Sequence, residues 1–223
     1  MEVQATYLHD RGMSRPLRRL FQLYAGLVLY GVSMALMIRA DLGLDPWDVF
    51  HQGLAGRTGL SFGTVTILTG AAVLLAWVPL RQRPGVGTVS NVVVIGLAVD
   101  AALGAIPDGG PLGVRLAMLV SGVALNGVAG AAYIGAGLGP GPRDGLMTGL
   151  VARTGGSVRA VRTGIEVAVL LAGAALGGTV GLGTALYALG IGPLLHVLLP
   201  PLTVGGAAGA RRPRLSPAPA GPS

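Results

Sequence analysis

The chain contains one stretch twice, at residues 40–61 and 136–157, and this repetition constrains its fold more than any other feature. The copies read ADLGLDPWDVFHQGLAGRTGLS and AGLGPGPRDGLMTGLVARTGGS, and they align without a gap at a constant offset of 96 residues. The identities continue on both sides, because residues 23–100 and 119–196 match at roughly 30 of about 78 positions. The chain is therefore built from two related halves.

Each copy of the stretch lies between long apolar segments. Hydrophobic residues make up 52% of the chain and charged residues only 11%, a composition typical of membrane proteins and not of nucleic-acid-binding domains. The apolar core of a bilayer is about 30 Å thick and needs roughly 17–25 helical residues to cross. Six segments meet that requirement: 20–38, 62–80, 88–106, 114–135, 160–178 and 183–200. We therefore predict an all-α membrane protein with six transmembrane helices.

The two halves each hold three of these spans, with repeat one at about 20–106 and repeat two at about 114–200. Since three is an odd number, the second half must enter the membrane in the opposite sense to the first. Inverted repeats of this kind are common in transporters. The transmembrane domain is thus expected at 20–200, with an N-terminal tail at 1–19. A disordered tail rich in Pro, Ala, Gly and Arg is expected at 201–223.

The arginine residues indicate the orientation. Most of them lie in the two tails, in the 81–87 loop and in the 136–159 connection, which would share one side of the membrane. Loops that carry an excess of Arg and Lys remain in the cytoplasm. We therefore expect a multi-pass protein of the bacterial inner membrane with both termini in the cytoplasm.

The repeated stretch itself predicts two short helices, at about 46–57 and 142–153. Pro46 and Pro142 suit the first helical position, and Gly59 and Gly155 suit the position just after the last turn. About 12 residues span only about 18 Å, which is too short to cross the bilayer. Two placements are compatible with this length: each helix could lie flat at an interface, or it could enter the membrane as a re-entrant half-helix.

Asp48 and Asp144 occupy equivalent positions in the first turns of these helices and are the leading candidate ligands. As intramembrane acids they would bind an ion or take up a proton. The simpler interpretation is that they complement the helix dipole, a contribution of about 0.3–1 kcal/mol each. Both interpretations stay open at this point.

Four further residues are candidates. Arg57 and Arg153 lie near the last turns of the short helices, where they could position the two aspartates or complement the negative end of the dipole. Asp100 and His196 occupy matching positions within the third and sixth spans and are secondary candidates. We find no motif for a metal site, a cofactor or catalysis.

The segment LGLDPWDVFHQGLAGRTGLSFGTV resembles the signature of the YczE-like membrane proteins, within the YczE/YyaS/YitT group of bacterial integral membrane proteins. Pro46, Trp47 and Asp48 form its core. The second copy departs from the pattern, with Arg143 at the position of Trp47. The resemblance implies an inner-membrane helical bundle, and family labels lean towards a permease.

We therefore expect a non-enzymatic permease for a small solute or ion, with its site between the two repeated connections. The alternative is a membrane scaffold or regulator that transports nothing. The expected partners are the lipid bilayer and a small solute or ion, with no nucleic acid, and homo-oligomerisation remains open. Burial of Asp48 and Asp144 beside a cavity would favour transport, whereas exposure of both to water would favour the scaffold.

Overall fold

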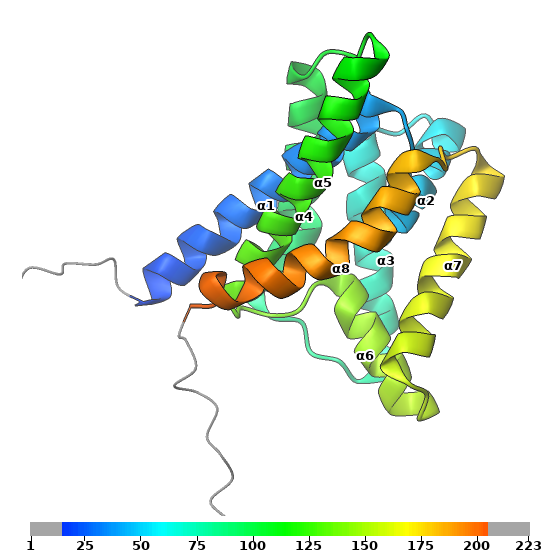
Figure 1. Cartoon of the computed structure of the whole chain (residues 1–223). Coiled ribbons are helices and arrows are strands. Elements are labelled where there is room, and N and C mark those ends of the chain that lie inside the picture. Colours follow the sequence, from blue (N-terminus) through cyan, green and yellow to red (C-terminus); the bar gives the residue numbers. More distant parts are fainter. Residues whose placement is uncertain (1–14, 205–223) are drawn as a thin grey trace, which may run out of the picture.

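The computed structural model describes residues 15–204, and the regular structure within that range is entirely helical (Figure 1). The predicted tails at 1–19 and 201–223 lie mostly outside the described residues. The helices are α1 (Arg15–Ala40), α2 (Pro46–Thr58), α3 (Phe62–Leu80), α4 (Val86–Ala105), α5 (Leu112–Gly135), α6 (Pro142–Thr154), α7 (Val158–Leu176) and α8 (Leu182–Leu202).

Five of the described helices are long and apolar enough to cross a membrane: α1 from Pro16, α3, α4, α5 and α8. The sixth expected span, at 160–178, corresponds to α7. This helix has the 19-residue length of α3, but its first half carries Arg159, Arg162 and Glu166. Composition therefore supports five spans, and α7 is a long helix whose charges distinguish it from the others.

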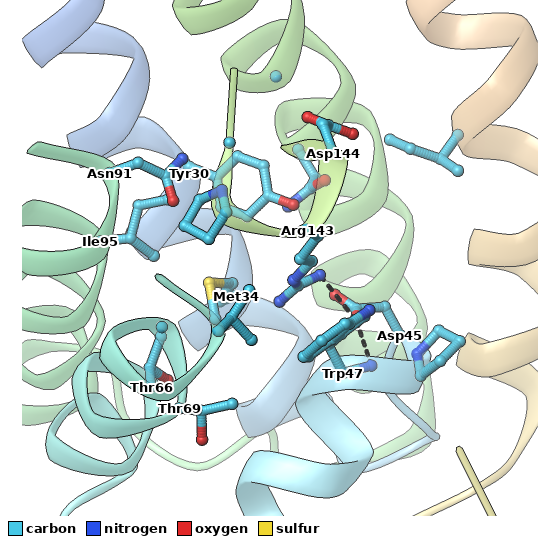
Figure 2. Close-up of a pocket in the computed structure, with 18 of the residues that line it drawn as sticks. Tyr30, Met34, Asp45, Trp47, Thr66, Thr69, Asn91, Ile95, Arg143 and Asp144 are labelled. Atoms are coloured by element: carbon cyan, nitrogen blue, oxygen red, sulfur yellow. Dashed lines mark hydrogen bonds and ion pairs between the residues drawn. The ribbon is translucent and has the colours of Figure 1, made fainter. Parts of the chain in front are cut away.

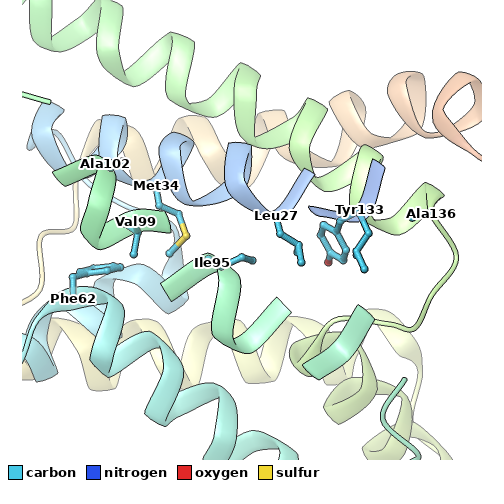
Figure 3. Close-up of a cluster of buried hydrophobic side chains, with 10 residues drawn as sticks. Leu27, Met34, Phe62, Ile95, Val99, Ala102, Tyr133 and Ala136 are labelled. Atoms are coloured by element: carbon cyan, nitrogen blue, oxygen red, sulfur yellow. The ribbon is translucent and has the colours of Figure 1, made fainter. Parts of the chain in front are cut away.

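Helix α1 packs extensively against both α4 and α5. Leu27 and Met34 from α1 meet Ile95 and Val99 from α4, and Tyr133 from α5 closes the same cluster (Figure 3). Lipid tails are as apolar as these side chains, so helices in a bilayer associate through close packing and not through a hydrophobic driving force. This packed centre fixes the frame around which the other helices are arranged.

The two short helices begin inside the bundle and end at its surface. At the start of α2, Trp47, Asp48 and Val49 are buried, whereas the last turn is exposed. Both helices end at a glycine in the left-handed conformation, Gly59 with φ 72° and Gly155 with φ 67°. The expected breaks at proline and glycine are therefore present in the structure.

Each short helix packs against a long helix of the other half: α2 lies on α7, and α6 lies on α3. The hydrogen bonds between the halves come in equivalent pairs. The Gly183 N–H donates to the Leu42 carbonyl at 2.7 Å, and the Gly87 N–H donates to the Leu138 carbonyl at 2.8 Å. Both donors and both acceptors are related by the 96-residue offset, so the two halves hold each other by the same contact.

The short helices run towards opposite ends of the bundle (Figure 1). Arg57, near the end of α2, donates to the Leu176 carbonyl at the end of α7. Arg153, near the end of α6, donates to the Pro79 carbonyl at the end of α3. The end of α7 lies beside the end of α1, because the Leu44 N–H, just after α1, donates to the Thr179 carbonyl, just after α7. The start of α4, which follows the loop after α3, lies beside the end of α5, because the Gly87 N–H donates to the Leu138 carbonyl, just after α5.

The contact between α6 and α3 depends on a glycine. Trp77 of α3 is 1% exposed, and its indole N–H donates to the Pro142 carbonyl at 3.1 Å. A Cβ on Gly145 would overlap the Trp77 ring. Overpacking at this contact should destabilise the folded protein by about 1–3 kcal/mol. We therefore expect Gly145→Leu to lower the thermal unfolding midpoint of the purified protein by about 2–12 °C.

The matched control is Gly164→Leu, because Gly164 is also helical but has open space beside it. Unfolding midpoints measured side by side in one detergent would check this prediction. Equal midpoints for the two variants would contradict the close approach of α6 to Trp77.

Candidate functional site

A cavity of about 240 Å³ lies at the centre of the molecule, and all eight described helices contribute to its wall. The N-termini of α2 and α6 both reach it, through Pro46 and Pro142. Its wall contains charged groups together with aromatic and amide side chains. The aromatic and amide residues include Tyr30, Trp47, Asn126, Tyr133 and Tyr187. Polar groups this deep in an apolar bundle are rare and are candidates for function.

Two aspartates from the start of α2 form one side of the site. Asp45 is the N-cap, and its Oδ1 accepts hydrogen bonds from the backbone N–H groups of Trp47 at 2.9 Å and Asp48 at 3.1 Å. Both Asp45 and Asp48 are fully buried. The Oδ2 atoms of these two carboxyls have no hydrogen-bond partner.

Arg143, the second residue of α6, reaches across to these aspartates from the other half of the chain. Its guanidinium lies 3.5 Å from Asp45 Oδ1, and its Cζ lies 5.0 Å from the centre of the Trp47 ring (Figure 2). The guanidinium also lies 3.7 Å from Asp48 Oδ1. These separations exceed those of direct hydrogen bonds, so the ion pairs are loose. One cation thus connects the starts of the two short helices.

Burial and neighbouring charges act on the acidity of this cluster. Burial raises the pKa of Asp45 and the nearby Asp48 raises it further, whereas Arg143 lowers it. Burial also raises the pKa of Asp48, again opposed by Arg143. His51 Nδ1 lies 3.2 Å from Asp48 Oδ1 and 3.5 Å from Thr66 Oγ1, which extends the polar cluster to α3.

The two leading sequence candidates both belong to this region. Asp144 lines the cavity, whereas Asp48 is buried behind the wall, where it contacts His51 and Arg143, which do line the cavity. Figure 2 shows Arg143 between Asp144 on one side and Asp45 with Trp47 on the other. The structure therefore brings the starts of both repeated helices to a single site.

The structure does not bring Arg57 and Arg153 to this site. Each lies near the far end of a 13-residue helix and bonds to a backbone carbonyl of the other half. A helix of that length separates its ends by about 18 Å. The sequence analysis expected Arg57 to position Asp48. In the structure Arg143, and not Arg57, lies close enough to Asp48 to do so.

The secondary candidates also lie elsewhere. Asp100 accepts hydrogen bonds from the Gly63 N–H at 2.7 Å and from the Ser61 hydroxyl at 2.5 Å, so it caps the start of α3. His196 is exposed on α8 and is not part of the cavity wall. The matching positions of these two residues in the repeat therefore reflect no shared site.

The sequence analysis did not select Asp45, Arg143 or His51 as site residues. A signal for Arg143 was present, because a cation replaces Trp47 beside the helix-starting proline in the second copy. Asp45 and His51 have Gly141 and Met147 at their equivalent positions, so the repeat pattern did not point to them.

The fold and the site together define a multi-pass helical membrane protein with a buried, charged central cavity. The chain belongs to the family of unknown function DUF6198, whose model matches residues 17–200. The resemblance to YczE-like membrane proteins is confirmed by its relatives.

The uncharacterized membrane protein YczE of Bacillus subtilis is 36% identical over 180 residues, which cover 79% of this chain and 83% of that protein. An uncharacterized protein of Haemophilus influenzae is 38% identical over 173 residues, covering 78% and 79% of the two chains. The uncharacterized protein YyaS of Bacillus subtilis is 25% identical over 179 residues, covering 78% and 89%. No solved structure matches the chain.

The dependence of the two buried aspartates on Arg143 is testable. Replacing one member of a buried ion cluster leaves uncompensated charge and costs about 3–5 kcal/mol. We expect Arg143→Leu to unfold at a clearly lower temperature than the parent. Adding Asp45→Asn and Asp48→Asn should recover part of the loss, because the charges then disappear together.

Arg153→Leu serves as the control, because Arg153 is exposed and donates to a single carbonyl. Unfolding midpoints of the single and triple variants would be compared. A triple variant less stable than Arg143→Leu would show that the aspartates do not depend on this cation.

The capping role of Asp100 gives a separate prediction. Asp100→Ala removes the acceptor for the Gly63 N–H at the start of α3 and should cost about 0.5–2 kcal/mol of stability. Unfolding midpoints of the variant and the parent, measured in one detergent, would check this loss. An unchanged midpoint would contradict the capping role of Asp100.

Proposed function

We propose that this protein is a small-solute permease of the bacterial inner membrane, whose substrate site is the central cavity. The observation that carries the proposal is the cluster of Asp45, Asp48 and Arg143 beside a cavity reached by the starts of both short helices. Short helices interrupted by Gly and Pro at matching points of two halves are typical of transporter sites. Asp48 and Asp144 would bind the proton or cation that is coupled to transport.

The proposal includes six spans in two inverted halves, with α7 as the sixth span. The reciprocal hydrogen bonds of Leu42 with Gly183 and of Leu138 with Gly87 support this arrangement. The charges of α7 are compatible with it, because Arg162 and Glu166 line the cavity and pair with each other at 3.0 Å. In this arrangement α2 and α6 are re-entrant half-helices and not interfacial ones.

The same arrangement leaves both chain ends on one side of the membrane. Gln22, near the start of α1, donates to the Leu202 carbonyl at the end of α8, so the described ends meet. The distribution of arginine favours the cytoplasm for that side. The alternative of a scaffold that transports nothing predicts water-facing carboxylates, and the complete burial of Asp48 argues against it.

A flux assay tests the permease proposal. Proteoliposomes that contain the purified full-length chain, with a pH-sensitive dye inside and an imposed pH gradient, would be exposed in turn to small amines, carboxylates and amino acids. We expect at least one class to drive proton movement above that of empty liposomes. The double variant Asp48→Asn with Asp144→Asn should reduce this movement to the background.

Asp108→Asn is the matched control, because Asp108 is exposed and pairs with Arg39 away from the cavity. Full flux in the double variant would remove Asp48 and Asp144 from the mechanism. The absence of solute-driven flux for every class would contradict the permease proposal itself.

A further inference from the structure

The charges around the cavity do not balance. Four carboxyl groups, those of Asp45, Asp48, Asp144 and Glu166, lie at the site together with two guanidiniums, those of Arg143 and Arg162. The site therefore has an excess of two carboxyl groups. Uncompensated charge inside a membrane protein costs several kcal/mol per ion, so this excess favours the uptake of positive charge.

Two carboxyl oxygens are also free to accept a donor. The Oδ2 atoms of Asp45 and Asp48 are buried without a hydrogen-bond partner, and Asp45 lines the cavity. A buried acceptor that lacks a partner is unfavourable, typically by about 1–3 kcal/mol. An N–H or O–H donor that enters the cavity would relieve this cost.

The aromatic wall is suited to a cation. Trp47, Tyr30, Tyr133 and Tyr187 surround the space, and ring faces attract ammonium and guanidinium groups. The protein already uses this mode, because Arg143 lies over the Trp47 ring while it faces two carboxylates. Arg143 therefore shows which type of group this environment accommodates.

A bare metal ion is a poorer match. Among residues 15–204 no three carboxylate or imidazole groups come together in a way that could hold one metal ion. Hard cations such as calcium require six to eight oxygen ligands. The cavity, at about 240 Å³, is also far larger than a single ion.

An anion is disfavoured although two helix N-termini and Arg143 are present. The start of α2 is already capped by Asp45, which accepts from the Trp47 and Asp48 N–H groups. Asp144 occupies the first turn of α6, and Arg143 faces Asp45 and Asp48. The positive groups that an anion would need are thus beside carboxylates of the protein itself.

We infer that the cavity binds a small organic cation through a protonated amine, with Asp45 and Asp144 as its carboxylate partners and the tyrosine rings as its wall. The amine and protons compete for these carboxyls, so binding of one monovalent amine releases a proton. Amine binding does not depend on the proposed permease function, whereas transport of the bound amine rests on it. Exchange of an amine for a proton would then leave the total charge of the site unchanged.

The other titratable and charged groups that face the site come from five helices. Tyr30 belongs to α1, His51 to α2, Tyr133 to α5, Arg162 and Glu166 to α7, and Tyr187 to α8. Asp48 is buried behind the wall, in contact with the lining residues His51 and Arg143. The carboxyls are expected to dominate the pH dependence, because the Tyr187 hydroxyl is engaged with Asn126 and Arg162 is paired with Glu166.

Calorimetric titration of the purified full-length chain tests the inference. The probes are ethylammonium chloride, sodium acetate, glycine and sodium chloride at constant ionic strength. We expect ethylammonium to bind, to bind more tightly at pH 8 than at pH 6, and to release protons, as the dependence of the heat on buffer ionisation would reveal. Asp144→Asn should weaken binding by at least roughly tenfold, because a charge contact in the cavity is lost.

Asp108→Asn is again the control and should leave ethylammonium binding unchanged. If Asp144→Asn does not fold, Asp45→Asn carries the same expectation. Binding of acetate in place of ethylammonium would overturn the inference, and so would sodium binding as tight as that of ethylammonium. Ethylammonium binding without flux in proteoliposomes would leave the cation site standing and remove the permease function.

Discussion

Two carboxyl groups at the start of α2 are buried inside an apolar bundle, and the architecture depends on how their charge is compensated. Asp45 and Asp48 come from the first half of the chain, and Arg143 comes from the second. Neither half contains the complete cluster. The two halves must therefore assemble with the helix starts face to face, which also explains why each short helix packs on a long helix of the other half.

The two halves share a backbone plan but differ in chemistry at the site. Trp47 and Arg143 are equivalent positions, and in the structure one lies over the other. Asp45 is replaced by Gly141 in the second copy, so the carboxyls are concentrated on one side of the cavity. A duplicated frame has thus given an asymmetric site, in which one half supplies most of the acids and the other supplies the cation.

The sequence predicted the helices well, because Pro46, Pro142 and the glycines after each short helix are local signals. It also identified Asp48 and Asp144 through the repeat. It did not predict the contact of Arg143 with Asp45 and Asp48, because that contact joins residues about 96 positions apart and depends on how the halves dock. Asp100 was selected for its place within a span, but only the tertiary structure reveals that it caps α3.

The central claim is that α2 and α6 start at one cavity and end on opposite faces of the membrane. The chain contains no cysteine, so single cysteines can be placed at Leu60 and Gly156, just beyond the two helix ends. Labelling of intact cells with a membrane-impermeant maleimide should modify Leu60→Cys but reach Gly156→Cys only after permeabilisation. Labelling of both positions from the same side would contradict the account.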